Sequence, residues 1–316
     1  MVFLVTGGAG FIGRWVTKNL LALNRDVVVI DNLSNSQMKN LAEFDDNPNL
    51  KDVIIGDIRD YELIKNLFKK YKFKTCIHLA AQINVQESLD HPERAYENNI
   101  LGTYNILEAA RLINTKIVLI GTCMVYDLAE ANMEISENHK LKPASPYAGS
   151  KLAAEELALS YYHGLGLPVI ILRPFNTYGP FQKTNMDGGV VSIFVKQKIK
   201  NEKLKIYGEG TQTRDLLYVE DCAEFIVKAA ETENCIGEII NGGTGTDISI
   251  NNLAKLIINN ENQIEHVEHH HPQAEIMKLV CNNSKAKTLL DWNPKTSLEE
   301  GIKKLEKWIR ESEMIN

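Results

Sequence analysis

Three side chains in this sequence could move a proton between them: the hydroxyl of Thr122, the phenol of Tyr147 and the ammonium group of Lys151. Tyr147 and Lys151 are four residues apart, so a helix that begins at Ser145 and Pro146 places them on one face. A nearby ammonium group lowers the pKa of a phenol, and a phenolate can take the proton of an alcohol while a hydride leaves the same carbon. Thr122, at the end of a strand-like run, can hold the alcohol oxygen. Together they predict a redox proton relay, although a Tyr-x-x-x-Lys pair by itself usually only decorates a helix surface.

Cys123 and Met124 directly follow Thr122 and belong to the same set of candidate catalytic residues. A methionine thioether cannot transfer a proton. A cysteine thiol can, if cationic neighbours lower its pKa from about 8.5, but in apolar surroundings it is inert. Cys123 is therefore either a proton acceptor or a small apolar residue of the core, and the sequence leaves both open.

A glycine-rich segment, VTGGAGFIG, connects the first expected strand to the first expected helix. Gly7, Gly10 and Gly13 permit a tight turn and let backbone N–H groups approach a diphosphate, which the helix N-terminus favours. Asp31, eighteen residues after Gly13, can accept hydrogen bonds from ribose hydroxyls and would repel a 2′-phosphate. This spacing predicts NAD, rather than NADP, as the cofactor. The residues expected to contact the cofactor are Gly7, Gly10, Phe11, Ile12, Gly13, Asp31, Asn32, Asp57, Ile58, Leu79, Ala80, Ala81, Gln82, Tyr147 and Lys151.

Short apolar runs alternate with helical patterns through the first half of the chain. Strands are expected at 2–6, 26–31, 51–57, 74–80, 115–121 and 167–174, and helices at 11–23, 60–71, 92–113 and 147–164. This alternation predicts an α/β fold with right-handed βαβ units and a doubly wound parallel sheet, covered by helices on both faces. We expect residues 1–175 to form a Rossmann-type NAD-binding domain and residues 176–316 a smaller α/β lobe for the substrate. Residues 215–245 are a candidate for a return to the sheet.

Composition and charge exclude several other classes of protein. The chain has 316 residues, of which 44% are hydrophobic and 24% charged, and its formal net charge is −6. These values are typical of a globular protein with no electrostatic attraction to nucleic acid or to an anionic membrane. The five cysteines are scattered without a Cys-x-x-Cys pair, so neither a disulfide framework nor a zinc site is expected. The chain starts without the features of a signal peptide, and no apolar run approaches the roughly 18 residues that cross a bilayer, so we expect a cytoplasmic protein.

Several segments together resemble the extended short-chain dehydrogenase/reductase family: TGGAGFIG, DNLS, GDIRD, HLAAQ, NNILGTYNILEAAR, SPYAGSK, RPFNTYGPFQ and GEGTQTRDLLYVEDCAE. Members of this family epimerise, dehydrate or decarboxylate nucleotide-linked sugars with NAD. The resemblance runs from residue 1 to about residue 230 and continues weakly through SKAKTLLDWNP. It implies a nucleotide-diphosphate sugar as substrate, with UDP as the expected nucleotide. It also implies a homodimer that pairs through the helices at 92–113 and 147–164.

The resemblance implies roles for further residues. Asn99 supports the active-site helix and its lysine beside the cofactor, while Asn176 and Arg214 grip the diphosphate, for which a guanidinium fork is suited. The family often has Arg-Pro-Gly where this chain has HHHPQAEI, so either His271 replaces that arginine or the contact is missing. Adjacent histidines on an extended chain point to opposite sides, and no metal site is expected. The residues expected to bind the substrate are Thr122, Asn176, Gly189, Val190, Ile206, Tyr207, Gln212, Arg214 and His271.

Cys123 and Met124 reduce the number of reactions of this family that the chain can be expected to catalyse. In the 4,6-dehydratases of the family an Asp-Glu pair at these positions removes water, so ordinary 4,6-dehydration is disfavoured here. A 4-epimerase needs only Thr122, Tyr147 and Lys151 to oxidise the sugar at C4 and return hydride to the other face. A 5,6-dehydratase would use the transient C4 ketone to lose the C5 hydrogen and the C6 hydroxyl, and then return the hydride.

The Cys-Met pair is similar to that of the UDP-N-acetylglucosamine 5,6-dehydratase of the tunicamycin pathway. On that resemblance we expect a 5,6-dehydratase, with a 4-epimerase of UDP-glucose or UDP-N-acetylglucosamine as the alternative. A noncatalytic NAD-binding sensor could have lost the relay residues, and a simple carbonyl reductase would lack RPFNTYGP and TQTRD. All of these are present, so both classes are disfavoured.

Overall fold

A seven-stranded parallel sheet forms the centre of the molecule, in the strand order β11-β6-β5-β4-β1-β2-β3. The computed structural model describes residues 1–129, 133–184, 188–258, 260–268 and 277–314. Its sheet strands are β1 Val2–Thr6, β2 Asp26–Asp31, β3 Leu50–Ile55, β4 Thr75–His78, β5 Lys116–Ile120, β6 Val169–Pro174 and β11 Ile239–Gly242. The chain runs outward from β1 to β3, returns across β1 to β4 and continues to β6. The doubly wound α/β fold predicted from the sequence is confirmed.

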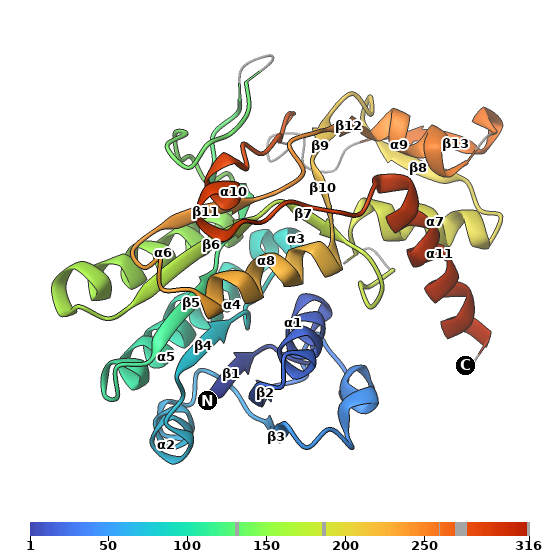
Figure 1. Cartoon of the computed structure of the whole chain (residues 1–316). Helices are drawn as coiled ribbons and strands as arrows, with labels where there is room; N and C mark the ends of the chain where they lie inside the picture. Colours follow the sequence, from blue (N-terminus) through green and yellow to red (C-terminus); the bar gives the residue numbers. More distant parts are fainter. Residues whose placement is uncertain (130–132, 185–187, 259, 269–276, 315–316) are drawn as a thin grey trace.

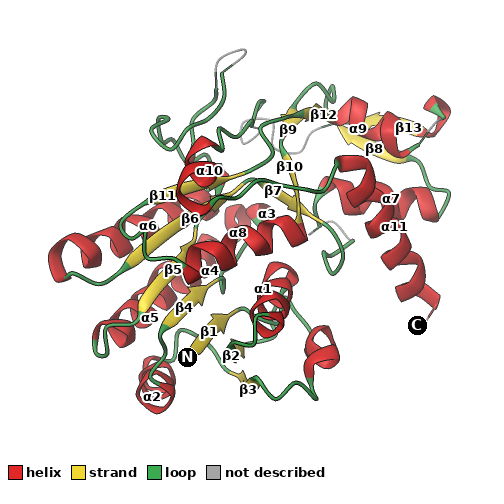
Figure 2. Ribbon diagram, viewed as in Figure 1, coloured by secondary structure: helices red, strands yellow, loops and turns green. Residues whose placement is uncertain are grey.

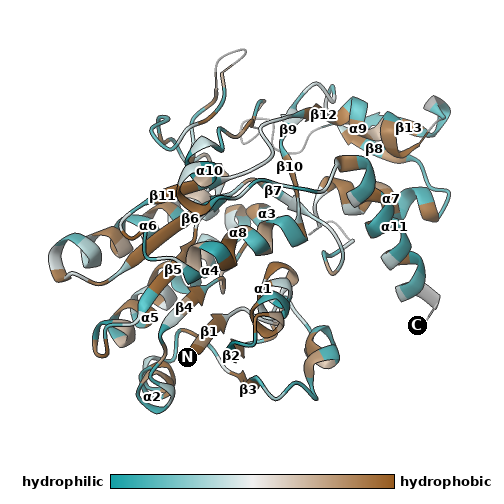
Figure 3. Cartoon of the chain, in the orientation of Figure 1, coloured by the Kyte–Doolittle hydropathy of each residue, from teal (hydrophilic) through white to brown (hydrophobic). Residues whose placement is uncertain are grey.

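Helices cover both faces of this sheet (Figures 1 and 2). Alternate strand residues face opposite sides, so Phe3 and Val5 belong to one apolar cluster and Leu4 to the other. The first cluster includes residues of α1 Phe11–Ala22 and α8 Val219–Glu231, and the second includes residues of α2 Tyr61–Tyr71, α5 Gly102–Arg111 and α6 Pro146–Leu165. Strands β5 and β6 are buried along their whole length, and Figure 3 shows the sheet as largely hydrophobic.

Helix α6 has clear start and stop signals. The Ser145 side chain caps it by accepting a hydrogen bond from the Ala148 N–H, and Pro146 occupies its first turn. It ends at Gly166, whose φ of 71° lies in the left-handed region that glycine adopts without strain. These signals fix where the helix face that carries Tyr147 and Lys151 begins.

The region expected as one helix at 92–113 consists of three consecutive helical elements. They are α4 Pro92–Tyr96, a π-helical turn η2 Glu97–Leu101 and α5. A short helix, α3 Val85–Asp90, precedes them and was not expected from the sequence. Asn99 lies in the π-helical turn, a rare conformation that is often found at functional sites.

The second lobe is built on a separate apolar core around Phe194, Leu253 and Leu305. Its strands pair two by two: β7 Asn176–Tyr178 with β10 Leu216–Tyr218, β8 Leu204–Tyr207 with β13 Ile264–Val267, and β9 Thr213–Arg214 with β12 Ile248–Ser249. Its helices are α7 Val190–Ile199, α9 Ile250–Ile257 and α11 Leu298–Met314. Short 3-10 turns occur at η1 Met38–Phe44, η3 Cys123–Val125 and η4 Glu261–Gln263.

Two segments beyond residue 176 lie against the central sheet. Helix α8 packs against α1, and β11 pairs with β6. Helix α10 Ser284–Leu290 then packs on β11 and α8. Part of the chain beyond residue 175 therefore packs with the central sheet. The division into domains at residue 175 stays a prediction. No helix in the part of the chain described here combines the length and apolar character needed to span a membrane.

Candidate active site

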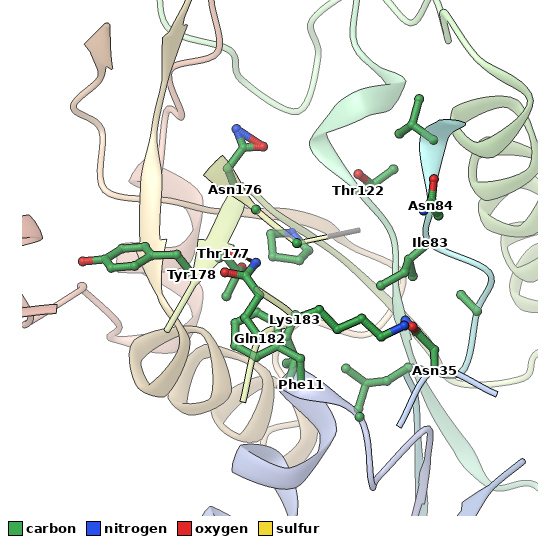
Figure 4. Close-up of a pocket in the computed structure, with 18 of the residues that line it drawn as sticks. Phe11, Asn35, Ile83, Asn84, Thr122, Asn176, Thr177, Tyr178, Gln182 and Lys183 are labelled. Carbon is green, nitrogen blue, oxygen red and sulfur yellow. Dashed lines mark hydrogen bonds between the residues drawn. The ribbon is translucent and has the colours of Figure 1, made fainter. Parts of the chain in front are cut away.

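A cavity of about 750 Å³ opens at the carboxyl ends of the central strands and continues into the second lobe. Residues that directly follow β1, β4, β5 and β6 line it, namely Gly7, Leu79, Gly121 and Phe175. In open α/β sheets this edge is where ligands bind, because the strand order reverses there. Figure 4 shows the cavity, with Thr122 and Asn176 on one side and Phe11 and Asn35 on the other.

The glycine-rich loop can accept a diphosphate. Gly7 has a φ of +68°, and a Cβ on it would lie 2.9 Å from the Ala80 nitrogen, while a Cβ on Gly13 would collide with the Gly7 carbonyl oxygen. Gly10 caps α1 without a side-chain hydrogen bond, so the N–H groups of the first turn keep their donor capacity for a ligand. Phe11, Ile12 and Gly13 of that turn line the cavity, and a helix N-terminus favours negative charge. The loop therefore fits the diphosphate of NAD.

Asp31 is held ready at the end of β2. Its carboxylate accepts hydrogen bonds from Ala9 N at 3.0 Å, Leu33 N at 2.9 Å and the Ser36 hydroxyl at 2.8 Å, and the side chain lines the cavity. A carboxylate offers about four lone-pair positions, so it can still accept from a ribose hydroxyl. Its negative charge disfavours a phosphate in the same place, which fits NAD.

Most of the predicted cofactor contacts line this cavity, but Asp57, Gln82 and Asn99 do not. Asp57 pairs with Arg59 at 2.8 Å, and the hydrogen bond from Arg59 lowers the pKa of Asp57 to about 2. Gln82 and Asn99 bond to each other: Gln82 N donates to Asn99 Oδ1 at 2.8 Å and Asn99 Nδ2 donates to Gln82 O at 3.0 Å. These three predicted contacts are therefore not among the residues that line the cavity.

Thr122, Tyr147 and Lys151 line the cavity together. Thr122 follows β5, and its hydroxyl accepts a hydrogen bond from Met124 N at 3.2 Å. The Lys151 ammonium group donates to Ile120 O at 2.6 Å, which ties α6 to the end of the same strand. The structure thus brings the predicted relay residues to one place.

Buried donors and acceptors fix the position of α6. Asn99 Nδ2 donates to the Ser150 hydroxyl at 2.8 Å, and that hydroxyl donates to Tyr147 O at 2.8 Å. Tyr147 N donates to Ser88 Oγ at 3.1 Å. The π-helical turn and α3 therefore act through backbone and Ser150 contacts to hold the helix turn that presents the phenol.

Burial sets the protonation of the relay. It raises the pKa of Tyr147 to about 12, partly offset by hydrogen bonding with the Thr122 side chain. It lowers the pKa of Lys151 to about 8, and the negative charge of Glu155 opposes this change. The ligand-free phenol is therefore neutral near pH 7. The positive nicotinamide ring of bound NAD would favour its ionisation.

Glu155 is a member of this site that sequence reasoning missed. It lies one turn after Lys151 on the same face of α6, is fully buried and pairs with Arg173 at 2.6 Å. Arg173 also donates to the Tyr126 hydroxyl at 2.8 Å. The second carboxylate oxygen of Glu155, Oε1, has no hydrogen-bond partner among the described residues and lies where a side chain on Gly121 would collide with it. Its spacing of four residues from Lys151, which places both on one helix face, is the feature of the sequence that could have identified it.

His78 is a second missed residue, although it is the first residue of HLAAQ. It is buried between the hydroxyls of Thr6 at 2.7 Å and Thr103 at 3.0 Å. Burial, with the added effect of the Lys151 charge, lowers the pKa of His78 to about 3, so the ring is neutral. Thr103 donates in turn to Asn99 O at 2.6 Å. The imidazole therefore links β1 to the π-helical turn and is uncharged near pH 7, with its single ring proton held within these hydrogen bonds.

Cys123 and Met124 line the cavity, and neither is charged near pH 7 in this structure. The Cys123 side chain is 2% exposed, in an apolar cluster with Val125, Phe175 and Cys281. Burial raises the pKa of Cys123 to about 12, and Arg214 offsets this only in part. Among the described cavity-lining residues, Asp31 is the only carboxylic acid, and it belongs to the cofactor half. The arrangement therefore offers no carboxylate pair beside Thr122.

The second lobe contributes the remaining predicted substrate contacts. All of those in the described part of the chain line the cavity: Thr122, Asn176, Gly189, Val190, Ile206, Tyr207, Gln212 and Arg214. Asn176 Nδ2 and Gln182 Oε1 are buried polar atoms without a hydrogen-bond partner in the described structure, so a ligand can satisfy them. Gln182, Lys183 and Lys205 line the cavity as well and were not expected from the sequence.

His271 lies outside the described residues, as does the rest of the histidine run. Within the residues that are described, no three His, Cys, Asp or Glu side chains are grouped so that they could hold a metal ion. The five cysteines are all buried and unpaired with one another.

The chain is similar to several known proteins in sequence and in structure. Residues 4–305 match the family described as GDP-mannose 4,6 dehydratase. The chain is 36% identical over 317 residues to a putative UDP-glucose 4-epimerase of Methanocaldococcus jannaschii, covering 98% of each chain. Among solved structures, Pal from Bacillus thuringiensis is 56% identical with a TM-score of 0.97, covering 99% of this chain and 100% of that one.

Another solved structure shows ligands in a related protein. It is the UDP-glucuronic acid 4-epimerase of Bacillus cereus in complex with UDP-glucuronic acid and NAD. This protein is 31% identical to the present chain, with a TM-score of 0.90, and the match covers 99% of this chain and 100% of that one.

Proposed function

The chain belongs to the GDP-mannose 4,6 dehydratase family of NAD-dependent nucleotide-sugar enzymes, and from this premise we propose that it oxidises a UDP-linked sugar transiently at C4. We further propose 4-epimerisation as the net reaction. One observation carries this choice: Thr122, Tyr147 and Lys151 line the cavity beside the dinucleotide loop, while the two residues after Thr122 are a neutral thiol and a thioether. A reaction that needs only the relay and a returned hydride suits this site best.

The relay residues have distinct tasks in that reaction. The hydride chemistry at C4 would be supplied by bound NAD, which would accept a hydride from the sugar and return it. Tyr147 accepts the proton of the C4 hydroxyl as the carbonyl forms and gives it back when the alcohol is regenerated. Thr122 orients the same oxygen, and the ammonium group of Lys151 favours the phenolate. No proton or electron is gained overall, so the product has the mass of the substrate.

The second lobe must hold the nucleotide while the sugar turns. Arg214, on β9, supplies a guanidinium group for the diphosphate, and Asn176 supplies a buried amide donor. Inversion at C4 requires the keto sugar to present its other face, so the grip must be on the nucleotide and not on the ring. The placement of both groups in the second lobe supports this division.

Elimination across C5 and C6 is the second candidate, and the placement of Cys123 in the cavity wall favours it. In that reaction the thiolate would take the C5 proton, the C6 hydroxyl would leave with a proton as water, and the hydride would return to C4. Burial opposes this role because it raises the pKa of the thiol to about 12. The 5,6-dehydratase expected from the sequence therefore stays a prediction, ranked below epimerisation.

Product analysis with several UDP-sugars separates the two reactions. UDP-glucose, UDP-glucuronic acid and UDP-N-acetylglucosamine would each be incubated with the enzyme, and the products examined by mass spectrometry and proton NMR. Epimerisation predicts an unchanged mass and an inverted C4 proton. Loss of one water with new enol-ether absorbance would support elimination instead, and absence of both changes with every UDP-sugar would contradict the proposal.

We also propose that the protein is a homodimer. Tyr96, Leu101 and Tyr104 lie on the α4-η2-α5 segment, and each keeps between 44% and 46% of its surface exposed. Apolar side chains this exposed on consecutive helical turns suit pairing with a second copy. Light scattering at the exit of a sizing column should give twice the mass of one chain for the wild type. The Tyr104→Glu variant should give the mass of a single chain. A monomeric wild-type protein would contradict this assembly.

A further inference from the structure

Residues 180–183 form a crossing segment that runs from β7 of the second lobe back to α1 of the cofactor domain. The Trp15 indole N–H, on α1, donates to Pro180 O at 3.3 Å. The Phe181 ring lies 6.0 Å from that of Trp15 and 5.0 Å from that of Trp308 on α11. The segment therefore touches helices of both lobes.

The centre of the crossing segment is held by a buried cation. The Arg14 guanidinium lies 3.8 Å from the centroid of the Phe181 ring, and Arg14 is 2% exposed. Arg14 also pairs with Glu43 and donates to Asn40 O at 3.1 Å. Phe181 has a φ of +72°, a strained conformation for a residue other than glycine. The ring contacts compensate for this strain, so the segment has a fixed position over α1.

Lys183 follows this anchor directly. Its carbonyl oxygen accepts a hydrogen bond from the Ser192 hydroxyl of α7 at 3.0 Å, which fixes the backbone from the second-lobe side. Its side chain is exposed and lines the cavity, and Figure 4 shows it extending toward Asn35, which comes shortly after Asp31. An ammonium group from the second lobe is thus directed at the half of the cavity that takes the dinucleotide.

We propose that Lys183 binds the diphosphate of the dinucleotide and so helps to retain NAD between turnovers. Four cationic side chains line the described part of the cavity: Lys151, Lys183, Lys205 and Arg214. Lys151 belongs to the relay, is buried and donates to Ile120 O, while Lys205 and Arg214 lie on β8 and β9. Because the crossing segment is held on α1, the Lys183 side chain can extend to the half of the cavity expected to take the dinucleotide. Retention of NAD matters because the hydride must return to the sugar that lost it. This requirement rests on the proposed function.

The test compares Lys183→Met with Lys205→Met, a matched removal of a lining ammonium group in the second lobe. Binding of NAD and of UDP to the full-length protein would be measured separately by calorimetry, after the resident dinucleotide has been removed, and thermal unfolding would confirm that both variants are folded. Lys183→Met should weaken NAD binding roughly fivefold at low salt and leave UDP binding unchanged, whereas Lys205→Met should leave NAD binding unchanged. Lys183→Arg should keep most of the NAD affinity, and the difference between wild type and Lys183→Met should shrink as salt is added.

Two results would overturn the proposal. An unchanged affinity of Lys183→Met for NAD would show that the ammonium group makes no contact with it, and weaker binding of UDP alone would assign Lys183 to the sugar nucleotide. Both readouts are equilibrium binding measurements, so they hold whether or not the protein epimerises a sugar. Failure of the proposed reaction would appear only in the product analysis.

Discussion

Tyr147, Lys151 and Glu155 occupy consecutive turns of one face of α6, and their charges influence one another. The negative charge of Glu155 raises the pKa values of both Lys151 and Tyr147. For Lys151 it opposes the effect of burial, and for Tyr147 it adds to it. Arg173 neutralises Glu155 from the other side at 2.6 Å, and neutral His78 lies near Lys151. Glu155 does not line the cavity, so it acts on the relay through its charge and not by touching a ligand.

Replacement of this carboxylate should move the pH dependence of the reaction. Glu155→Gln removes a charge that raises both pKa values, so Lys151 loses its proton at lower pH and Tyr147 ionises at lower pH. Both limbs of the profile of kcat against pH should therefore shift toward acid. The variant also leaves Arg173 without its buried partner, which should cost up to about 3–5 kcal/mol of unfolding free energy.

The control is Glu156→Gln, which removes a charge at the neighbouring exposed position. Its pH profile and thermal stability should match those of the wild type. Loss of stability in Glu155→Gln without any shift of the pH profile would mean that Glu155 is only a partner for Arg173.

Cys123 should be dispensable if the reaction is epimerisation. Cys123→Ala removes a buried sulfur from the apolar cluster with Phe175 and Cys281, at a cost of about 1–2 kcal/mol of stability. The rate of C4 inversion should stay within about twofold of the wild type, because the neutral thiol transfers no proton. A drop of a hundredfold or more, together with loss of a dehydrated product, would assign the thiol as the base of an elimination.

At the scale of elements, the loop between β1 and α1 tolerates little added volume. Gly13→Ala places a Cβ against the Gly7 carbonyl oxygen, so the turn that receives the diphosphate must open. We expect a loss of about 1–3 kcal/mol of stability and a large loss of NAD affinity, measured by thermal unfolding with and without NAD.

Gly164→Ala is the matched control, because a Cβ at that position of α6 meets no atom within 4 Å. It should keep full NAD affinity and raise stability slightly, since alanine favours the helix. Equal NAD affinity in Gly13→Ala and wild type would contradict the assigned role of the loop.

The sequence predicts those features that depend on local spacing. The glycine turn, the strand that ends in Asp31, the strand that precedes Thr122 and the step from Tyr147 to Lys151 follow from residue types a few positions apart. The π-helical turn around Asn99 does not, because 92–113 has an ordinary helical pattern and the extra residue per turn is stabilised by Asn99 bonding to Gln82 and Ser150. The approach of Lys183 to the cofactor half also depends on contacts between distant segments, here Phe181 with Arg14.

At the scale of the whole molecule, the two lobes divide the work. The sheet domain presents the relay and the dinucleotide loop, and the second lobe presents Arg214 and Asn176. The crossing segment joins them, and the proposed roles place Lys183 over the half of the cavity assigned to the cofactor and the sugar nucleotide in the other half. With a net charge of −6, the protein has no overall field that attracts anions, so the proposed binding of two diphosphates must depend on local cations and a helix N-terminus.

The fate of the hydrogen at C4 tests this account most directly. A UDP-sugar that the enzyme converts would be labelled with deuterium at C4, and its product examined by NMR and mass spectrometry after turnover in ordinary water. Transient oxidation with a retained cofactor predicts that the deuterium stays at C4 of the product, and that Tyr147→Phe forms almost no product while still binding UDP. A product with solvent hydrogen at C4 would contradict hydride return, and with it the central claim.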